Sequence, residues 1–280
     1  MPELPEVEVS RLGLLPHLTG RTIVRAVFRV SGLRYALPPE LAAKLAGRRV
    51  RAILRRGKYL LFDCADESGR DNGNGGWLIV HLGMSGSLRL VAVDAPAQKH
   101  DHVDIVFPET VLRLRDPRRF GAVLWHEGAD AGRHPAIAAL GIEPLSPEFG
   151  GQWLYAATRR RNTPIKPWLM DGHVLAGIGN IYASEALFRA GVAPTRAAGR
   201  IGRERCHELA AAIRATLEES IAAGGSSVRD YVHSDGGAGS FQVKCAVYGR
   251  AGEPCRICGA AIRALRQAGR ATFHCPRCQR

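Results

Sequence analysis

The stretch Pro2-Glu3-Leu4-Pro5-Glu6-Val7-Glu8 follows the initiator methionine and starts the first predicted helix, which we expect to run from Glu3 to His17. Proline at a first helical position loses no N–H that the helix needs, and acidic side chains suit the positive end of the helix dipole. These residues are therefore typical of an ordinary helix start. We expect this helix to pack against the strands that follow it.

The same residues also allow covalent chemistry. Removal of Met1 would leave Pro2 with a free secondary amine, and an α-amino group titrates near a pH of about 8, so part of it is nucleophilic at neutral pH. Attack of such an amine on a sugar aldehyde carbon gives an iminium, which makes the neighbouring C–H acidic. Glu3 could act beside it as a general acid or base. Taken alone, these residues favour the helix start, so the catalytic interpretation needs support from the rest of the chain.

Composition indicates a globular protein with a polyanionic partner. The chain has 280 residues, 46% of them hydrophobic, and this is long enough for two domains with cores of their own. Its net charge of +13 is dominated by arginine, which suits phosphates and base edges, although ribosomal and membrane-surface proteins share such a charge. No run of about eighteen apolar residues and no signal-peptide pattern are present, so we expect a bacterial cytoplasmic protein.

The hydrophobic pattern predicts an α+β fold. Strand-like runs at 22–30, 50–62, 77–93, 102–107 and 111–125 indicate an antiparallel β-sandwich, and helical patterns follow at 153–161, 167–171, 182–189 and 203–221. A proline- and glycine-rich stretch separates the two halves. We therefore predict a β-sandwich domain at 1–130, a connection at 131–151, a helical domain at 152–244 with an irregular loop at 224–240, and a cysteine-rich end at 245–280.

Four cysteines near the end of the chain have the spacing of a zinc site. Cys255 and Cys258 form one C-x2-C pair, Cys275 and Cys278 form another, and residues 259–274 lie between the pairs. This spacing predicts a four-thiolate zinc site on a β-hairpin, and redox-active pairs are the weaker alternative. A closed thiolate shell leaves no ligand position for water, so the one Zn²⁺ ion would be structural.

Two turns carry apolar side chains that would be poor core residues. They are His81–Gly86, with Met84 between glycines, and Asp116–Gly121, with Phe120 beside two arginines. Projecting apolar side chains can wedge between base pairs, whereas packing into the core is the alternative.

A third segment, Gly177-Ile178-Gly179-Asn180, leads into a predicted helix. Backbone N–H groups at such a helix start can bind an anion, although a plain junction between helices has the same pattern. Arg159, Arg160, Arg161 and Lys166 lie just upstream and favour a clamp on a duplex backbone.

Together these segments resemble the bacterial formamidopyrimidine-DNA glycosylase family, which removes oxidised purines from DNA. The resemblance covers essentially the whole chain, and its markers are PELPEVE, RRGKYL, HLGMSG, KHDHV, DPRRFG, IKPWLMD, GIGNIYASE, GGSSVRDYV, VYGR and the terminal CPRCQR. It implies a β-sandwich with a packed N-terminal helix, a helical domain with a helix-two-turn-helix motif, and a zinc-binding hairpin.

The resemblance also implies roles for residues. Pro2 resembles the nucleophile that forms a Schiff base at C1′, and Glu3 the proton donor, with Glu6 in the same pocket. Lys58 is similar to the residue tied to β-elimination, and Arg270 to the one tied to δ-elimination. The implied product is a one-nucleotide gap with phosphates on both ends.

Further positions match the family's DNA contacts. Met84, Arg118 and Phe120 resemble the residues that fill the void left by a flipped base, and Arg118 would face the orphaned cytosine. The segment from Ser226 to Tyr231 resembles the loop that closes over the flipped base, where the Ser226 carbonyl could recognise the N7–H of an oxidised guanine. The matches to backbone or lesion-side contacts are His81, His100, Arg161, Lys166, Asn180, Tyr248 and Arg270.

The resemblance predicts a monomer that acts on double-stranded DNA with damaged bases, associates with the nucleoid through DNA, and needs neither a nucleotide cofactor nor a membrane. Some features depart from the family pattern: the 66–76 loop is longer than expected, Ala264 replaces a basic residue, and Cys64, Cys206 and Cys245 match no functional position. Two alternatives stay open. They are the related endonuclease VIII branch, which prefers oxidised pyrimidines, and a non-catalytic zinc-hairpin DNA-binding protein.

Overall fold

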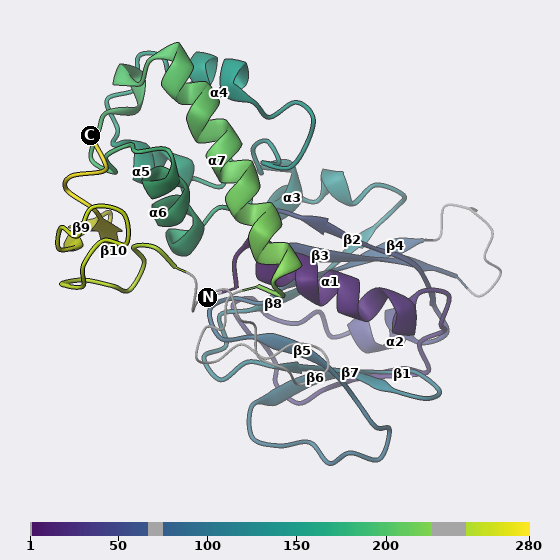
Figure 1. Cartoon of the computed structure of the whole chain (residues 1–280). Helices are drawn as coiled ribbons and strands as arrows, with labels where there is room; N and C mark the ends of the chain where they lie inside the picture. Colours follow the sequence, from purple (N-terminus) through teal and green to yellow (C-terminus); the bar gives the residue numbers. More distant parts are fainter. Residues whose placement is uncertain (1, 67–74, 226–244) are drawn as a thin grey trace. The chain divides into compact units, whose positions relative to one another are not determined.

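The computed structural model describes residues 2–66, 75–225 and 245–280, and the chain forms two compact units (Figure 1). The first unit contains Met1–Ala138 with Gly224–Ser240, and the second contains Ala139–Ala223 with Phe241–Arg280. The finer four-part division expected from the sequence stays a prediction.

In its described part, the first unit has two four-stranded antiparallel sheets. One has the strand order β2-β3-β4-β8 and the other the order β1-β6-β7-β5. The strands are β1 (Arg25–Phe28), β2 (Arg49–Arg56), β3 (Tyr59–Ala65), β4 (Gly76–His81), β5 (Ser87–Val91), β6 (Asp101–Val106), β7 (Val111–Arg115) and β8 (Ala122–Glu127). The antiparallel sandwich predicted from the sequence is confirmed.

Helix α1 (Leu4–Leu18) packs against this sandwich, as predicted. Its residues Val7, Leu14 and Leu18 are fully buried, and they share one core cluster with residues of both sheets, such as Phe62 and Val103. Burying these side chains stabilises the sheets and the helix together. The described residues of this unit also form three short helical pieces: α2 (Leu41–Leu45), η1 (Ala131–Arg133) and α3 (Pro135–Ala138).

Three of the predicted strand runs were wrong as single strands. The runs at 50–62, 77–93 and 111–125 each form two strands with a turn between them. Gly57 and Gly83 adopt left-handed backbone conformations in two of these turns, with φ of 56° and 65°, and Arg119 does so in the third, with φ of 55°. Such a residue reverses the chain while the apolar alternation continues on both sides of it.

The second unit is helical and ends in a β-hairpin. Its elements are α4 (Gly151–Thr158), α5 (Ile165–Leu169), α6 (Asn180–Arg189), η2 (Ala198–Arg200), α7 (Arg203–Ala222), β9 (Arg263–Gln267) and β10 (Arg270–His274). Helix α7 packs against α4 and α6, and the hydroxyls of Tyr182 on α6 and Ser220 on α7 share a buried 2.6 Å hydrogen bond. Helix α6 also packs against β10.

A tight turn joins β9 to β10. Ala268 and Gly269 are both left-handed, with φ of 45° and 76°, which matches the right-handed twist of the two strands and places Arg270 directly after the turn. None of the helices formed by the described residues is long and apolar enough to cross a membrane.

Candidate functional site

Strand register gathers several predicted site residues at one end of the sandwich. His81 pairs with Tyr59 on β3 and with Ala122 on β8, while Arg115 on β7 pairs with Ser87 on β5 and Asp101 on β6. The turns at 82–86 and 116–121 cross between the sheets at this end. This end therefore carries Lys58, His81, Met84, His100, Arg118 and Phe120.

Helix α1 directs its first residues toward the same end. Arg11 Nη1 on α1 donates to the carbonyl of Ile53 at 3.3 Å, and Arg55 Nε on β2 donates to Glu8 Oε2 at 2.9 Å. Helix α1 and strand β2 therefore run in opposite directions, and the start of the helix lies near the end of the strand. With a rise of about 1.5 Å per helical residue and about 3.3 Å per strand residue, Glu3 comes level with the Gly57-Lys58 turn.

The start of α1 is buried and held in place. Pro2, Glu3 and Glu6 are all buried, with Glu3 1% and Glu6 0% exposed. The Glu3 backbone N–H donates to Glu6 Oε2 at 2.8 Å, so the glutamate one turn into the helix fixes the residue beside Pro2. The first residues of α1 thus have the geometry of an ordinary helix start. In this geometry the candidate amine of Pro2 and the candidate carboxyl group of Glu3 are both buried.

His81 is a neutral hydrogen-bond donor at this end. Its Nδ1 accepts from the Gly83 backbone N–H at 2.9 Å, so the ring proton of the neutral side chain lies on Nε2. Burial, followed by the positive charges of Lys58 and Arg34, lowers the His81 pKa to about 4. The ring also lies 4.7 Å from that of Tyr59, centroid to centroid. At neutral pH this histidine can donate to an anion without carrying a charge.

The tips of the two turns are exposed. Met84 is 38% and Phe120 45% exposed, and the Arg118 guanidinium lies 4.8 Å from the centroid of the Phe120 ring. Neither apolar side chain fills the core of the unit. An exposed methionine, phenylalanine and arginine at neighbouring turns are suited to enter a stacked or apolar surface.

In the second unit, Lys166 lies inside the fold. The side chain is 1% exposed, and its ammonium donates to Asn180 Oδ1 at 2.6 Å, to Thr272 Oγ1 at 2.8 Å and to the Ala271 carbonyl at 3.1 Å. Lys166 thereby joins α5, the start of α6 and β10, next to the exposed Arg270. A pocket of about 190 Å³ lies between the α5 segment and the β9–β10 hairpin, lined in part by Lys166, Asp171 and Arg270.

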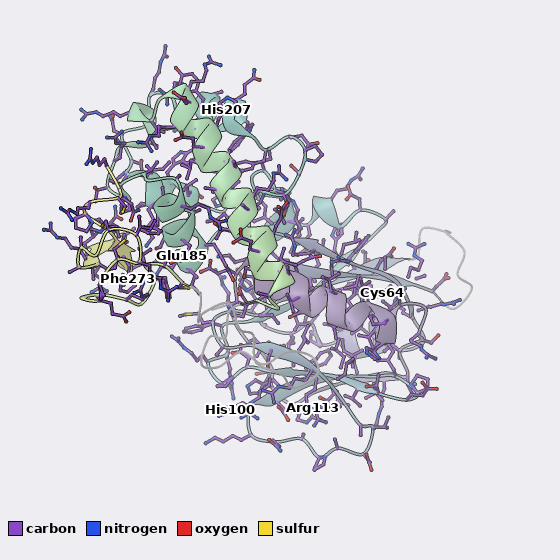
Figure 2. The ribbon with its side chains drawn as sticks, in the orientation of Figure 1. Cys64, His100, Arg113, Glu185, His207 and Phe273 are labelled. Atoms are coloured by element: carbon purple, nitrogen blue, oxygen red, sulfur yellow. The ribbon has the colours of Figure 1, made fainter. Side chains whose placement is uncertain are left out.

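Glu185 is a buried carboxylate that the sequence analysis missed. It lies on α6, is labelled in Figure 2, and accepts hydrogen bonds from three consecutive backbone N–H groups, those of Ala246 (2.7 Å), Val247 (3.0 Å) and Tyr248 (2.8 Å). The Tyr248 ring in turn stands edge-on to Phe273, with centroids 5.3 Å apart. Glu185 thus fixes the segment that presents Tyr248. Arg161, another predicted contact, follows α4 and is exposed.

The four predicted cysteines converge at the base of the β9–β10 hairpin. Their sulfur atoms all lie within 4.8 Å of one another, with Cys255 Sγ 3.9 Å from Cys278 Sγ and Cys258 Sγ 3.4 Å from Cys275 Sγ. Zinc–sulfur bonds of about 2.3 Å in a tetrahedron give sulfur–sulfur edges of about 3.8 Å, so these cysteines fit one zinc ion. The separations are too long for a disulfide, so the four cysteines are not paired with one another.

Two predicted contacts, Ser226 and Tyr231, lie outside the described residues.

Besides Glu185, the sequence analysis also missed the buried Ser85 and Asp116 in the two turns. A signal for one of them existed, because aspartate directly before proline commonly organises a turn through its side chain. The signal for Glu185 was weaker, since its partners follow more than 60 residues later.

Family models match nearly the whole chain. The formamidopyrimidine-DNA glycosylase N-terminal domain matches residues 1–123, its H2TH domain residues 140–232, and the zinc finger found in FPG and IleRS residues 252–280. The chain belongs to the formamidopyrimidine-DNA glycosylase family. These are DNA repair enzymes, and the predicted fold and zinc site are confirmed with the family.

Formamidopyrimidine-DNA glycosylases from Dechloromonas aromatica and Ralstonia nicotianae are 57% and 56% identical to the chain, each over 100% of both proteins. The solved structure of the Thermus thermophilus protein has a TM-score of 0.86 and 38% identity, covering 99% of this chain and 98% of that one. A Lactococcus lactis Fpg complex with an N7-benzyl-Fapy-dG containing DNA has a TM-score of 0.90 and 34% identity, covering 100% of both chains. A complex of the same enzyme with an abasic site containing DNA has a TM-score of 0.89 and 34% identity, covering 99% of both.

Proposed function

We propose that the chain excises oxidised purines such as 8-oxoguanine and formamidopyrimidines from duplex DNA and then cleaves the strand at the abasic site. The observation that carries this proposal is the buried pair Pro2 and Glu3 at the start of α1, directed to the end of the sandwich that also bears Lys58 and the two exposed turns. An enclosed amine beside a carboxyl group can form and use an iminium.

In the proposed reaction, the Pro2 nitrogen attacks C1′ of the damaged nucleotide, the bond from C1′ to the base breaks, and the base leaves with the proton that the amine gives up. Glu3 donates a proton to the sugar ring oxygen, so the ring opens and the C1′ iminium forms. Loss of a proton from C2′ then allows the C3′–O bond to break, and loss of a proton from C4′ allows the C5′–O bond to break. Lys58 is assigned to the first elimination and Arg270 to the second, leaving phosphates on both sides of a one-nucleotide gap.

DNA contacts are proposed from both units. Met84, Arg118 and Phe120 would fill the void left by the flipped base, which their exposure supports. His81 would donate its Nε2–H to a phosphate, and His100, Arg161, Asn180, Ser226, Tyr231 and Tyr248 are the further proposed contacts. Since the ammonium of Lys166 is held by three internal acceptors, we assign it to organising Asn180 and β10.

The substrate class is supported by the solved relatives. The Lactococcus lactis enzyme has been crystallised with DNA containing N7-benzyl-Fapy-dG and with DNA containing an abasic site, and these correspond to the two stages of the proposed reaction. A zinc ion held by Cys255, Cys258, Cys275 and Cys278 would stabilise the hairpin that carries Arg270, and a closed thiolate shell supplies no catalysis.

Borohydride trapping tests this proposal. Purified protein is incubated with a duplex that holds one 8-oxoguanine opposite cytosine, the reductant is added, and the crosslinked peptide is mapped by mass spectrometry. We expect an adduct on the peptide that begins at Pro2. The Glu3→Gln variant should bind the duplex and lose base release, which separates the acid from the nucleophile. An adduct on a lysine peptide, or none although Pro2 is free and the duplex is bound, would refute the proline mechanism.

A further inference from the structure

Asp116 occupies the first position of the turn that bears Arg118 and Phe120, and it is completely buried. Its Oδ2 accepts from the Gly121 N–H at 2.7 Å, and its Oδ1 accepts from the Arg118 N–H at 3.3 Å. One carboxylate thus holds both backbone ends of the segment that carries the exposed tip. This arrangement alone would be an ordinary turn stabilised by aspartate.

The same carboxylate also reaches the other turn. The buried hydroxyl of Ser85, next to Met84, donates to Asp116 Oδ1 at 3.0 Å, and it accepts from the Arg118 N–H at 3.3 Å. The backbones of the two turns touch here, because a Cβ atom on Gly83 would lie only 2.4 Å from the Gly121 nitrogen. Asp116 and Ser85 therefore bridge the segments that present Met84 and Phe120.

The main chain of Asp116 extends the connection to a third segment. Its N–H donates to the His100 carbonyl at 3.0 Å, and its carbonyl oxygen lies 3.0 Å from Nε2 of the buried His102 ring. His100 adopts a left-handed conformation with φ of 75°, which is unusual for a residue other than glycine and persists where surrounding bonds hold it. Three proposed DNA-contacting segments thus meet at one aspartate.

We propose that Asp116 and Ser85 are positioning residues, which lock the two turns into one rigid wedge and so allow Met84, Arg118 and Phe120 to replace an extruded base. The inference rests on the proposed function. A side chain that must displace a stacked base does so at lower cost when its backbone is ordered in advance, because entry into the duplex then fixes fewer torsions. Stabilising the turn at 116–121 alone would not require the Ser85 hydroxyl from the turn at 82–86.

Two substrates separate positioning from simple stability. Both hold one 8-oxoguanine, in one duplex opposite cytosine and in the other opposite a stable abasic analogue. The second duplex has no orphaned base to contact, and its 8-oxoguanine costs less to unstack. Base release from this duplex therefore depends less on the wedge. Single-turnover base release is measured on each duplex for the wild type, Asp116→Asn, Ser85→Ala and Val123→Ala. Val123 is a buried residue of β8 in the same unit and serves as a destabilised control, because its side chain has no hydrogen-bonding group that could hold either turn.

We expect Asp116→Asn to slow base release opposite cytosine by about tenfold or more, and by no more than about threefold opposite the abasic analogue, because an amide turns one acceptor into a donor. Ser85→Ala should change the ratio of the base-release rates on the two duplexes less than Asp116→Asn does. Val123→Ala should leave this ratio at the wild-type value. Equal losses of Asp116→Asn on both duplexes, or no loss, would overturn the inference. A wild-type protein that released no base from either duplex would instead refute the proposed function.

Discussion

The ammonium of Lys166 and the side-chain oxygen of Asn180 are 2.6 Å apart, and the lysine is almost completely buried. The same ammonium bonds to Ala271 and Thr272 on β10, so one cation holds a helix start and a strand together. Buried charges are stable only when hydrogen bonds replace the water they have lost. Lys166 is therefore part of the internal framework beside Arg270.

We expect Lys166→Met to destabilise the protein by about 2–4 kcal/mol, since it leaves buried acceptors without a donor. The free energy of unfolding is measured by urea denaturation. Lys99→Met provides the control, because Lys99 is exposed, and its effect should stay within about 0.5 kcal/mol. Equal stability of the Lys166 and Lys99 variants would contradict this account of the buried lysine.

Acid should weaken the first unit through His81. The folded-state pKa of this ring is about 4, below its ordinary value of 6.5, so the unfolded chain binds more protons between these two values. Stability is then fully present above pH 6.5 and decreases as the pH falls toward 4. In His81→Asn, whose amide oxygen can still accept from Gly83, the loss between pH 7 and pH 4.5 should be smaller by about 1–3 kcal/mol. Urea titrations at both pH values measure this, and an identical pH dependence would exclude His81 as the cause.

Zinc content should depend on four of the seven cysteines. We expect about one zinc ion per chain by atomic emission, and Cys275→Ala should lose it together with DNA affinity, because the metal supplies the folding energy of such a hairpin. Cys206→Ala is the matched control, as Cys206 is buried on α7 and is not a member of the sulfur cluster. Zinc retained by Cys275→Ala would show that the ligand set is wrong.

Glu185→Gln should weaken DNA binding by about tenfold, because a Gln side chain can no longer accept from all three N–H groups that place Tyr248. Fluorescence anisotropy with an abasic-site duplex measures the dissociation constant. If Glu185 acts through Tyr248, the double variant with Glu185→Gln and Tyr248→Phe should lose less DNA affinity than the sum of the losses in the two single variants. Glu219→Gln, at an exposed ion pair with Arg189, should leave affinity unchanged. Additive losses would show that Glu185 acts elsewhere.

Local patterns made much of the fold predictable. The apolar face of the helix at 203–221, the C-x2-C spacing within each cysteine pair and the alternating strands each depend on neighbours within a few residues, and these predictions are confirmed in α7, the sulfur cluster and the two sheets. The short helix α2 was missed because five residues give too little periodicity. The turn at Gly57 was missed because apolar residues continue on both sides of it.

Long-range hydrogen bonds were beyond sequence reasoning. Lys166 looked like a surface cation in a basic stretch, and its burial depends on Thr272, which lies 106 positions later in the chain. Asp116 looked like part of an arginine-rich turn, and its bridge to Ser85 depends on how two sheets bring their turns together. Spacing along the chain carries no information about such partners.

The antiparallel pairing of β3 with β4 has a practical consequence for engineering. The pair ends with Cys64 opposite Gly76, whereas Tyr59 and His81 lie at its other end, five strand residues and thus about 17 Å away. The connection between β3 and β4, which is longer than the family pattern led us to expect, thus begins and ends far from the end that carries the proposed catalytic residues. A reporter peptide or fluorophore attachment site can be spliced into this connection, and the labelled enzyme should keep the geometry with which it acts on DNA.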